Sequence, residues 1–341
     1  MRKLRILYLT HEDYVPPDDV KGLSDEERDK FKTDYDVIRG LRKLGHEVRV
    51  LGVIDDLGKI RSAVDEFKPH LAFNLLEEFH GTALYDQHVV SYLELLRTPY
   101  TGCSPRGLTI ARDKGLSKMI LAYHRVPIPK FAVFLMGAKI KRPAKLEFPL
   151  IVKSLTEHAS PGISQASAVT NDQKLKERVE LVHEQVGSDA IAEQYIDGRE
   201  LYVSVMGNQQ ARTFPPFELI FENLPAGVPR IATSRVKWNL RYQARVGVKL
   251  TEAAELPNGT AMRLARLSRR VYRNLFLTGY ARMDWRLTPE GKLYLLEANP
   301  NPDLACGEAF AESAAKAGIA YNTLLQKIVN LGLRYRAQWA E

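Results

Sequence analysis

Polar residues near the C-terminus have the types and spacing to bind a divalent cation. In YARMDWRLTPEGKLYLLEANPNPD, the turn residues 288–291 separate two alternating runs, which is typical of a β-hairpin. A four-residue loop predicts the pairs Leu287–Lys292, Asp284–Leu295 and Arg282–Glu297. Because side chains alternate along a strand, one face then carries a cation and three oxygen-bearing groups. These residues are Arg282, Asp284, Glu297 and Asn299.

Oxygen ligands without His or Cys favour Mg²⁺, which keeps water and phosphate oxygens in its shell, with Mn²⁺ as the alternative ion. The competing interpretation is a surface ladder of ion pairs that contributes little. Asp284 and Glu297 are each flanked by apolar residues, so both strands are expected to be buried. Buried carboxylates need partners, which favours the metal site.

A second pattern lies in AIAEQYIDGRELYVSVMG, where Asp197-Gly198 predicts a two-residue hairpin turn. That turn pairs Ile196 with Arg199 and Tyr195 with Glu200. One face would then carry two carboxylates and two aromatic rings, either as a solvent-facing side or as a nucleoside pocket. The four residues are Glu193, Tyr195, Glu200 and Tyr202.

Two lysines add candidate phosphate contacts. Lys153 ends an apolar strand in FPLIVKS, and Lys114 follows Asp113 in a helical segment; singly, either fits an ordinary surface lysine. The loop EHASPGIS follows Lys153, and its small residues let backbone N–H groups approach phosphate oxygens. No G-x-x-x-x-G-K-[ST] motif is present, which disfavours a P-loop enzyme.

The elements that must position these residues change in type along the chain. The first hundred residues alternate strand and helix, which predicts a doubly wound parallel sheet. Ser104-Pro105 is a helix start, with helix expected to about Tyr123. An α+β unit follows, then hairpins from Ala190, a long loop over 223–257, a basic helix and a last helix over 319–331. The expected strands of the first part are 4–10, 47–53 and 70–75, with helices at 57–67 and 84–96 and one ending before Gly45.

Composition bounds the class of protein. The chain has 341 residues, 45% hydrophobic and 26% charged, with a net charge of +8, as expected for a globular protein. No apolar run suits a membrane span, and two cysteines form no framework, which favours a cytoplasmic setting. Basic residues at helical spacing over 263–273 favour a solvated helix face over a nucleic-acid contact.

The ordered motifs resemble the ATP-grasp carboxylate–amine ligases, and within them the D-alanine–D-alanine ligase-like branch. The motifs are DK at 113–114, FPLIVKS with its loop at 148–164, AEQYIDGREL at 192–201 and ARMDWRL…LLEANPNPD at 281–303, with HG at 80–81 and PYTG at 99–102. The resemblance implies an N-terminal α/β domain (1–108), a central ATP-grasp lobe (109–192) and a C-terminal lobe (193–341), with ATP between the lobes.

The resemblance also implies residue roles. The phosphates would be bound by Lys114, Lys153 and the loop of Ala159, Ser160 and Gly162. The adenine side would be formed by Glu193, Gln194, Tyr195 and Ile196, and the ribose would be bound by Glu200. The reaction would be served by Lys237, which reaches the γ-phosphate, by Arg282 and by the magnesium ligands Asp284, Glu297 and Asn299. His80 and Glu308 are expected at the substrate end.

The substrate end departs from the family. The glycine-rich N-terminal loop is replaced by THEDYVPPDD, and Glu308 stands where a polar residue would hold a carboxylate. An anionic side chain repels a carboxylate and attracts an amine. We therefore expect an ATP- and Mg²⁺-dependent ligase that joins a small carboxylate to an amine (amino acids or short peptides) through an acyl phosphate. A phosphotransferase or a nucleotide-binding regulator is the alternative, and the family's frequent dimerisation suggests a homodimer.

Overall fold

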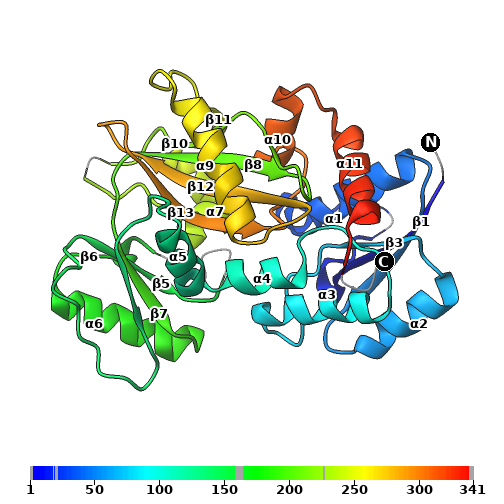
Figure 1. The fold of residues 1–341 in the computed structure, drawn as a ribbon, viewed down its shortest axis with the longest axis horizontal. Coiled ribbons are helices and arrows are strands. Elements are labelled where there is room, and N and C mark those ends of the chain that lie inside the picture. Colours follow the sequence, from blue (N-terminus) through cyan, green and yellow to red (C-terminus); the bar gives the residue numbers. More distant parts are fainter. Residues whose placement is uncertain (1–2, 18, 20–21, 158–163, 226, 338–341) are drawn as a thin grey trace.

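Three β-sheets organise the chain in the computed structural model, which describes residues 3–17, 19, 22–157, 164–225 and 227–337. Figure 1 shows the parallel sheet at one end of the molecule, a four-stranded sheet at the other, and the largest sheet between and above them. This mixed architecture confirms the expected fold class.

The N-terminal sheet is parallel and has the strand order β2-β1-β3. Its strands and helices are β1 (Arg5–His11), α1 (Asp25–Lys43), β2 (Glu47–Val53), α2 (Leu57–Phe67), β3 (Leu71–Asn74) and α3 (Asp86–Leu95). All four residues of β3 are buried, as expected for a strand covered on both faces. The predicted alternation of strand and helix is confirmed.

Two helices join this sheet to the rest, α4 (Pro105–Arg112) and α5 (Lys114–Tyr123). Ser104 caps α4 with Pro105 in its first turn, as predicted. The single helix expected to about Tyr123 is wrong, because Asp113 breaks it. The extended Asp113 accepts from the backbone N–H of Leu116 and caps the second helix.

The four-stranded sheet has the order β4-β7-β5-β6. Its elements are β4 (Phe131–Phe134), β5 (Leu150–Ser154), β6 (Ala168–Val169), α6 (Asp172–Leu181) and β7 (Ala190–Gln194). Leu150, Val152 and Ala192 lie in a core with the inner face of α6. The predicted strand FPLIVKS therefore places Lys153 among buried residues.

The largest sheet has the order β11-β10-β8-β12-β13, with β9 also paired to β8. Its elements are β8 (Arg199–Met206), β9 (Arg212–Thr213), β10 (Phe217–Phe221), β11 (Val248–Glu252), α9 (Thr260–Asn274), β12 (Tyr280–Leu287) and β13 (Leu293–Pro300). The hairpin predicted around Asp197-Gly198 is wrong. β7 pairs with β4 and β5, whereas β8 pairs with β9, β10 and β12. This turn therefore carries the chain from one sheet to another.

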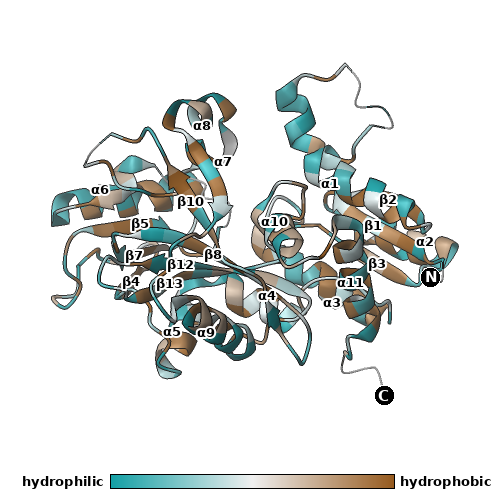
Figure 2. Cartoon of the chain, turned by 90° about the horizontal axis from the view of Figure 1, so that it is seen from above, coloured by the Kyte–Doolittle hydropathy of each residue, from teal (hydrophilic) through white to brown (hydrophobic). Residues whose placement is uncertain are grey.

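The long loop expected over 223–257 is also wrong. The segment forms α7 (Ser234–Trp238), α8 (Leu240–Val246) and β11, and Figure 2 shows both helices beside β10. Phe221, Val236 and Val246 form a small core of their own, which explains why this segment folds. Scattered apolar residues over short elements gave no clear period in the sequence.

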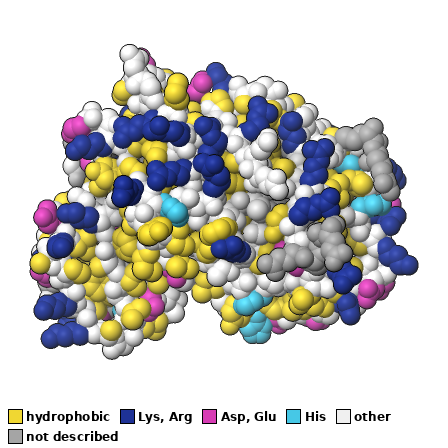
Figure 3. All heavy atoms as spheres, viewed as in Figure 1, with side chains coloured by type: hydrophobic (Ala, Val, Ile, Leu, Met, Phe, Trp, Pro, Cys, Tyr) yellow, Lys and Arg dark blue, Asp and Glu magenta, His cyan; other side chains and the backbone are white. Residues whose placement is uncertain are grey.

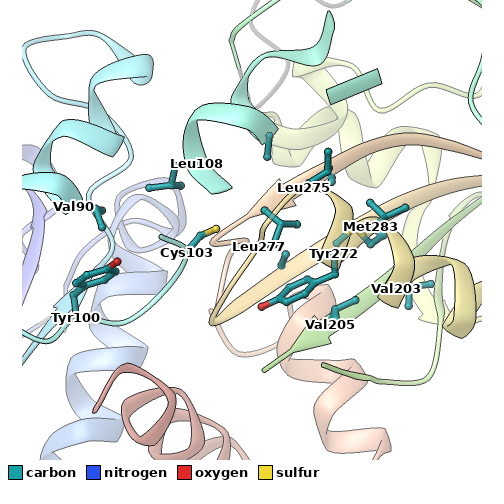
Figure 4. Close-up of a cluster of buried hydrophobic side chains, with 14 of the residues drawn as sticks. Val90, Tyr100, Cys103, Leu108, Val203, Val205, Tyr272, Leu275, Leu277 and Met283 are labelled. Carbon is teal, nitrogen blue, oxygen red and sulfur yellow. The ribbon is translucent and has the colours of Figure 1, made fainter. Parts of the chain in front are cut away.

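One hydrophobic core joins the two ends of the chain. Figure 4 shows Val90, Tyr100 and Leu108 facing Leu277 and the side chains of β8 and β12, with Cys103 between the two groups. The C-terminal helices α10 (Ala309–Lys316) and α11 (Tyr321–Arg334) add a second shared core with α1 and β1. The sheet that carries the predicted metal residues is thus held directly against the N-terminal part.

The basic helix predicted from the arginine spacing is α9. Figure 3 shows Lys and Arg side chains gathered over the part of the surface where Figure 1 places this helix. Arg263, Arg266 and Arg273 are exposed, whereas Arg270 donates to the backbone carbonyl of His124. No helix in the described part of the chain has the length and apolar character to cross a membrane.

Candidate active site

A single face of the largest sheet gathers the predicted metal and oxyanion residues together with Glu200. Pairing between β12 and β8 sets Arg282 opposite Ser204, Asp284 opposite Tyr202 and Arg286 opposite Glu200. On the other side of β12, Asp284 pairs with Glu297 and Arg282 with Asn299. Since paired residues share a face, three adjacent strands present one polar surface, which we call the polar face. Its members are Glu200, Tyr202, Ser204, Arg282, Asp284, Arg286, Glu297 and Asn299.

The predicted register of this hairpin is wrong by one residue at the turn and by two at the site. The turn spans five residues, because Leu287 pairs with Leu293. A bulge between Asp284 and Trp285 then shifts the pairing by one more residue. The two shifts together restore the alternation, so the predicted set still shares a face.

Asp284 lies at the centre of the polar face and is 4% exposed. Its carboxylate accepts from Arg282 at 2.7 Å from Nε and 3.0 Å from Nη2, and from Asn299 Nδ2 at 2.9 Å. Asn299 Nδ2 also lies 3.5 Å from Oε1 of Glu297. The structure thus brings together all four residues of the predicted metal and oxyanion set.

The charge balance of this cluster fits a divalent cation. The pKa of Asp284 is raised to about 6, mainly by burial and further by the negative charges of Glu297 and Glu200, whereas Arg282 lowers it. Adjacent carboxylates repel each other, and a cation between them removes that cost. Within the described residues, no three His, Cys, Asp or Glu side chains gather as a metal site. The donor set is therefore two carboxylates with an amide, a set of hard oxygen ligands suited to Mg²⁺.

Glu200 is the next carboxylate along the polar face and is held from two sides. Arg286 Nη2 donates to Oε2 at 2.8 Å, and Tyr202 Oη donates to Oε1 at 3.0 Å. The ring of Tyr202 also lies 4.5 Å below the guanidinium of Arg282. Arg286 was missed in the sequence, although it follows Arg282 and Asp284 at a spacing of two and so had to share their face.

The four-stranded sheet presents a second group of charges. Glu193 is 1% exposed, with Lys118 Nζ at 3.4 Å and Lys153 Nζ at 3.6 Å from its Oε2. Neither of its carboxylate oxygens has a hydrogen-bond partner among the described residues. Lys118 also donates to the carbonyl of Leu296 at 2.8 Å, which ties α5 to β13.

The two lysines respond differently to the same carboxylate. Burial lowers the pKa of Lys153, but attraction to Glu193, Glu297 and Glu200 outweighs it, so the pKa is raised. Burial lowers the pKa of Lys118 beyond what Glu193 restores, and nearby Lys153 lowers it further. Lys153 therefore interacts with carboxylates of both sheets, as Lys118 does with Glu193 and Glu297. Lys118 was also missed; it lies four residues after Lys114 and so on the same side of the helix.

The other predicted nucleotide residues lie at the end of β7, directly after it, and at the start of α5. Lys114 donates to the carbonyl of Glu157 at 2.5 Å, at the start of the small-residue loop. Gln194 N–H donates to Lys130, and Tyr195 N–H to Pro149, which extends the sheet. Ile196 is buried. These residues lie at the crossing from the four-stranded to the largest sheet.

Part of the predicted site lies outside the described residues. This holds for Ala159, Ser160 and Gly162, which belong to the small-residue loop, and for the side chain of Lys237 in α7. The backbone of α7 is described, and Arg230 before it accepts at its carbonyl from Arg286 at 3.0 Å.

The two predicted substrate residues occupy different surroundings. His80 lies in a turn with positive φ, and its Nδ1 is 3.8 Å from Asp55 in the N-terminal part. Glu308 precedes α10, with Lys32 of α1 at 3.3 Å from Oε1. Burial and Asp303 raise the pKa of Glu308, whereas Lys32 and Arg282 lower it. Glu308 is thus connected electrostatically to the polar face through Arg282.

The sequence and the fold of this chain resemble those of known proteins. The family model described as the D-ala D-ala ligase C-terminus matches residues 120–330, more than half of the chain. The chain belongs to the D-alanine–D-alanine ligase family. This match includes all strands of the four-stranded sheet and of the largest sheet. Membership makes the chain an ATP-grasp enzyme, an ATP-dependent ligase that forms carbon–nitrogen bonds, and the phosphotransferase or regulator alternative is not favoured.

Individual proteins resemble this ligase over most of their length. An uncharacterized protein, y4sG, from Sinorhizobium fredii is 30% identical over 87% of this chain and 86% of its own. A D-alanine–D-alanine ligase from Desulforudis audaxviator is 29% identical over 91% and 95%. The crystal structure of a D-alanine–D-alanine ligase from Bacillus anthracis, complexed with ATP, has a TM-score of 0.74 at 25% identity, covering 97% of this chain and 98% of its own.

Proposed function

We propose that the enzyme forms an amide or peptide bond between a small carboxylate and an amine through an acyl phosphate. A carboxylate oxygen attacks the γ-phosphorus of ATP, and ADP leaves. The amine nitrogen then attacks the acyl carbon, and phosphate leaves. The observation that supports this best is the polar face, where Asp284 pairs directly with Glu297 beside Arg282 and Asn299.

The first step depends on charge neutralisation, because phosphoryl transfer needs positioning and electrostatic stabilisation more than covalent chemistry. Lys153, which interacts with carboxylates of both sheets, and Lys114 at the small-residue loop would contact the phosphates, and we add Lys118 as a support for Glu193. Arg282 would steady the reacting carboxylate. Lys237 of α7 is proposed to reach the γ-phosphate, with Ser160 and Gly162 over the phosphates.

Glu193, Gln194, Tyr195 and Ile196 are proposed to form the adenine side. The side chain of Tyr195 is held in place for this role, because its hydroxyl accepts from the backbone N–H of Arg230 at 3.2 Å. Glu200 would accept from ribose hydroxyls, since each carboxylate oxygen retains a free lone pair beyond the contacts with Arg286 and Tyr202.

Asp284, Glu297 and Asn299 are the residues proposed to hold Mg²⁺. The ion would supply charge neutralisation to the phosphates of ATP. The protein's contribution is the fixed pairing of β12 with β13, which sets the two carboxylates opposite each other without a flexible loop.

We also propose that residues 223–257 cover the reacting groups and exclude water from the acyl phosphate. Arg230 at the start of this segment already touches Tyr195 and Arg286.

We propose that the three expected domains correspond to the three sheets. Helix α4 extends across the limit expected at 108, and strand β7 extends across the limit expected at 192.

The experiment is a matrix of carboxylates and amines incubated with ATP and Mg²⁺, with ADP measured and products identified by mass. D-alanine belongs in it, because the ligase relatives are named for that substrate. The proposal expects ADP release that requires a carboxylate and a product whose mass equals the two substrates minus water. ADP release with a phosphorylated acceptor as product would contradict it.

A further inference from the structure

The loop after β13 is joined to helix α1 by three contacts. Lys32 Nζ lies 3.3 Å from Oε1 of Glu308, and Thr33 Oγ1 donates to Oδ1 of Asp303 at 2.7 Å. A third contact runs from the backbone N–H of Cys306 to Oδ2 of Asp36 at 2.9 Å. Residues of α1 and of the loop over 301–308 therefore form one surface, although they are about 270 positions apart in the chain.

This surface carries an excess of negative charge. Burial is the main cause that raises the pKa of Glu308, Asp34 and Glu77, and Asp303 raises all three further, whereas Lys32 lowers the pKa of Glu308 and Arg112 lowers that of Glu77. Lys32 supplies a positive charge, but it is already paired with Glu308. We call this group the acceptor wall; it consists of Asp34, Asp36, Glu77, Asp303 and Glu308.

A buried hydroxyl beside the wall points independently to a ligand. Tyr280 is 0% exposed, and its Oη has no hydrogen-bond partner among the described residues. Tyr280 lies two residues before Arg282 on β12 and so shares its face of the sheet, and its phenol interacts electrostatically with Glu77 and Asp303. Because an unpaired buried hydroxyl is costly, a bound donor such as an ammonium group would satisfy its oxygen.

The wall lies next to the reacting centre. Asn299 ends the polar face, and the loop begins two residues later at Asn301, whose backbone N–H donates to the carbonyl of Tyr280. Arg282 acts on Glu308 electrostatically. Asp284 already accepts from two nitrogens of the Arg282 guanidinium. The positive charge of Arg282 is therefore balanced mainly by Asp284, and the wall remains acidic.

We propose that the acceptor wall selects an amine with a second positive charge and no carboxylate, that is, a diamine. This inference rests on the proposed ligase function and narrows its acceptor. A carboxylate on the acceptor would meet Asp303 and Glu308 at short range, whereas an ammonium group is attracted by both.

The bond changes follow the proposed ligation. The lone pair of one acceptor nitrogen forms the C–N bond at the acyl carbon, and the C–O bond to phosphate breaks. Phosphate leaves with that bonding pair, and the nitrogen releases its proton to solvent. The distal ammonium stays protonated against the wall and takes no part in the chemistry.

Three acceptors that differ by one group test the charge rule: 1,5-diaminopentane, lysine, which adds a carboxylate, and 1-aminopentane, which lacks the second charge. The readouts are kcat/KM for ADP release with the carboxylate found in the matrix, and affinity by calorimetry without turnover. We expect 1,5-diaminopentane to exceed the other two by at least tenfold in both. Equal values for lysine or 1-aminopentane would overturn the proposal.

A pair of variants locates the effect. Glu308→Ser keeps a residue suited to precede a helix and should reduce the preference for 1,5-diaminopentane about tenfold, through KM rather than kcat. The matched control is Glu312→Gln, an exposed acid one turn into α10, which should leave the preference unchanged. An unchanged preference in Glu308→Ser would refute the role of the wall.

Hydroxylamine separates this proposal from the ligase function itself. As a small uncharged nucleophile it captures an acyl phosphate without needing the wall, so the wild-type enzyme should form hydroxamate in the absence of any diamine. Absence of hydroxamate with every carboxylate would refute the acyl-phosphate function. The calorimetric comparison of 1,5-diaminopentane with lysine would still decide the acceptor proposal.

Discussion

The polar face and the acceptor wall are built in different ways. The polar face comes from three adjacent strands, and its central pair, Asp284 and Glu297, is separated by a single hairpin. The acceptor wall depends on contacts such as Thr33 to Asp303, across 270 positions. Regular strand pairing fixes the groups proposed for ATP. A surface made of a helix and a loop can change its charge without disturbing those strands.

The largest effect is expected from Glu297→Gln. The change keeps the size of the side chain but removes a charge, so the cation site should fail and ADP formation should fall by about 10³-fold or more. Glu290→Gln, in the exposed turn of the same hairpin, is the control and should retain full activity. Turnover near wild type in Glu297→Gln would remove the metal assignment and with it the contrast between the two regions.

Lys153→Met should reduce ADP formation about 10²- to 10³-fold, as expected for loss of one positioned charge. Lys118 still faces Glu193 in this variant, so the fold should persist, as circular dichroism can check. Lys141→Met, at an exposed position, serves as the control. A fall in both variants alike would show that Lys153 has no special position beside the carboxylates of both sheets.

The pKa of Asp284 predicts how the polar face responds to acid. Its pKa of about 6 without metal means that the carboxyl gains a proton as pH falls through 6. A protonated carboxyl cannot serve as an anionic ligand, so Mg²⁺ affinity should drop about tenfold per pH unit below that value. Calorimetry from pH 5 to 8 would measure it; affinity constant down to pH 5 would contradict the assignment.

The smallest effect is expected at the acceptor wall from Thr33→Val, which removes the donor to Asp303 but not the carboxylate. We expect a rise of about two- to fivefold in KM for the acceptor, since one exposed hydrogen bond contributes little. The KM for ATP should not change, and this measurement decides more directly whether the two regions are independent. Equal changes in both KM values would show that the two regions are not independent.

The same contrast explains what the sequence could predict. Alternation along β12 and β13 indicated Arg282, Asp284, Glu297 and Asn299 without a correct register, because two one-residue errors cancel in a period of two. The same rule could have found Arg286. Helix and strand limits in the N-terminal sheet also followed from strong local signals, with Glu47–Val53 and Leu57–Phe67 observed as expected.

The sequence could not predict how elements that are distant in the chain pack against each other. The turn at Asp197-Gly198 has the residues of a hairpin, yet tertiary packing sends β7 and β8 to different sheets. Lys32 and Asp36 carry no local signal, since their importance comes from packing of α1 against a distant loop. Residues 223–257 lack a clear period because they contribute only Val236 and Val246 to the small core that they form with Phe221.

The central claim is that ATP activates a carboxylate as an acyl phosphate, and oxygen labelling tests it most directly. The substrate carboxylate is prepared with ¹⁸O, and the released phosphate is examined by mass. If the account is correct, each phosphate carries one ¹⁸O, because the attacking carboxylate oxygen stays on phosphorus when the amine displaces it. Unlabelled phosphate, formed at the same rate as the amide product, would contradict it.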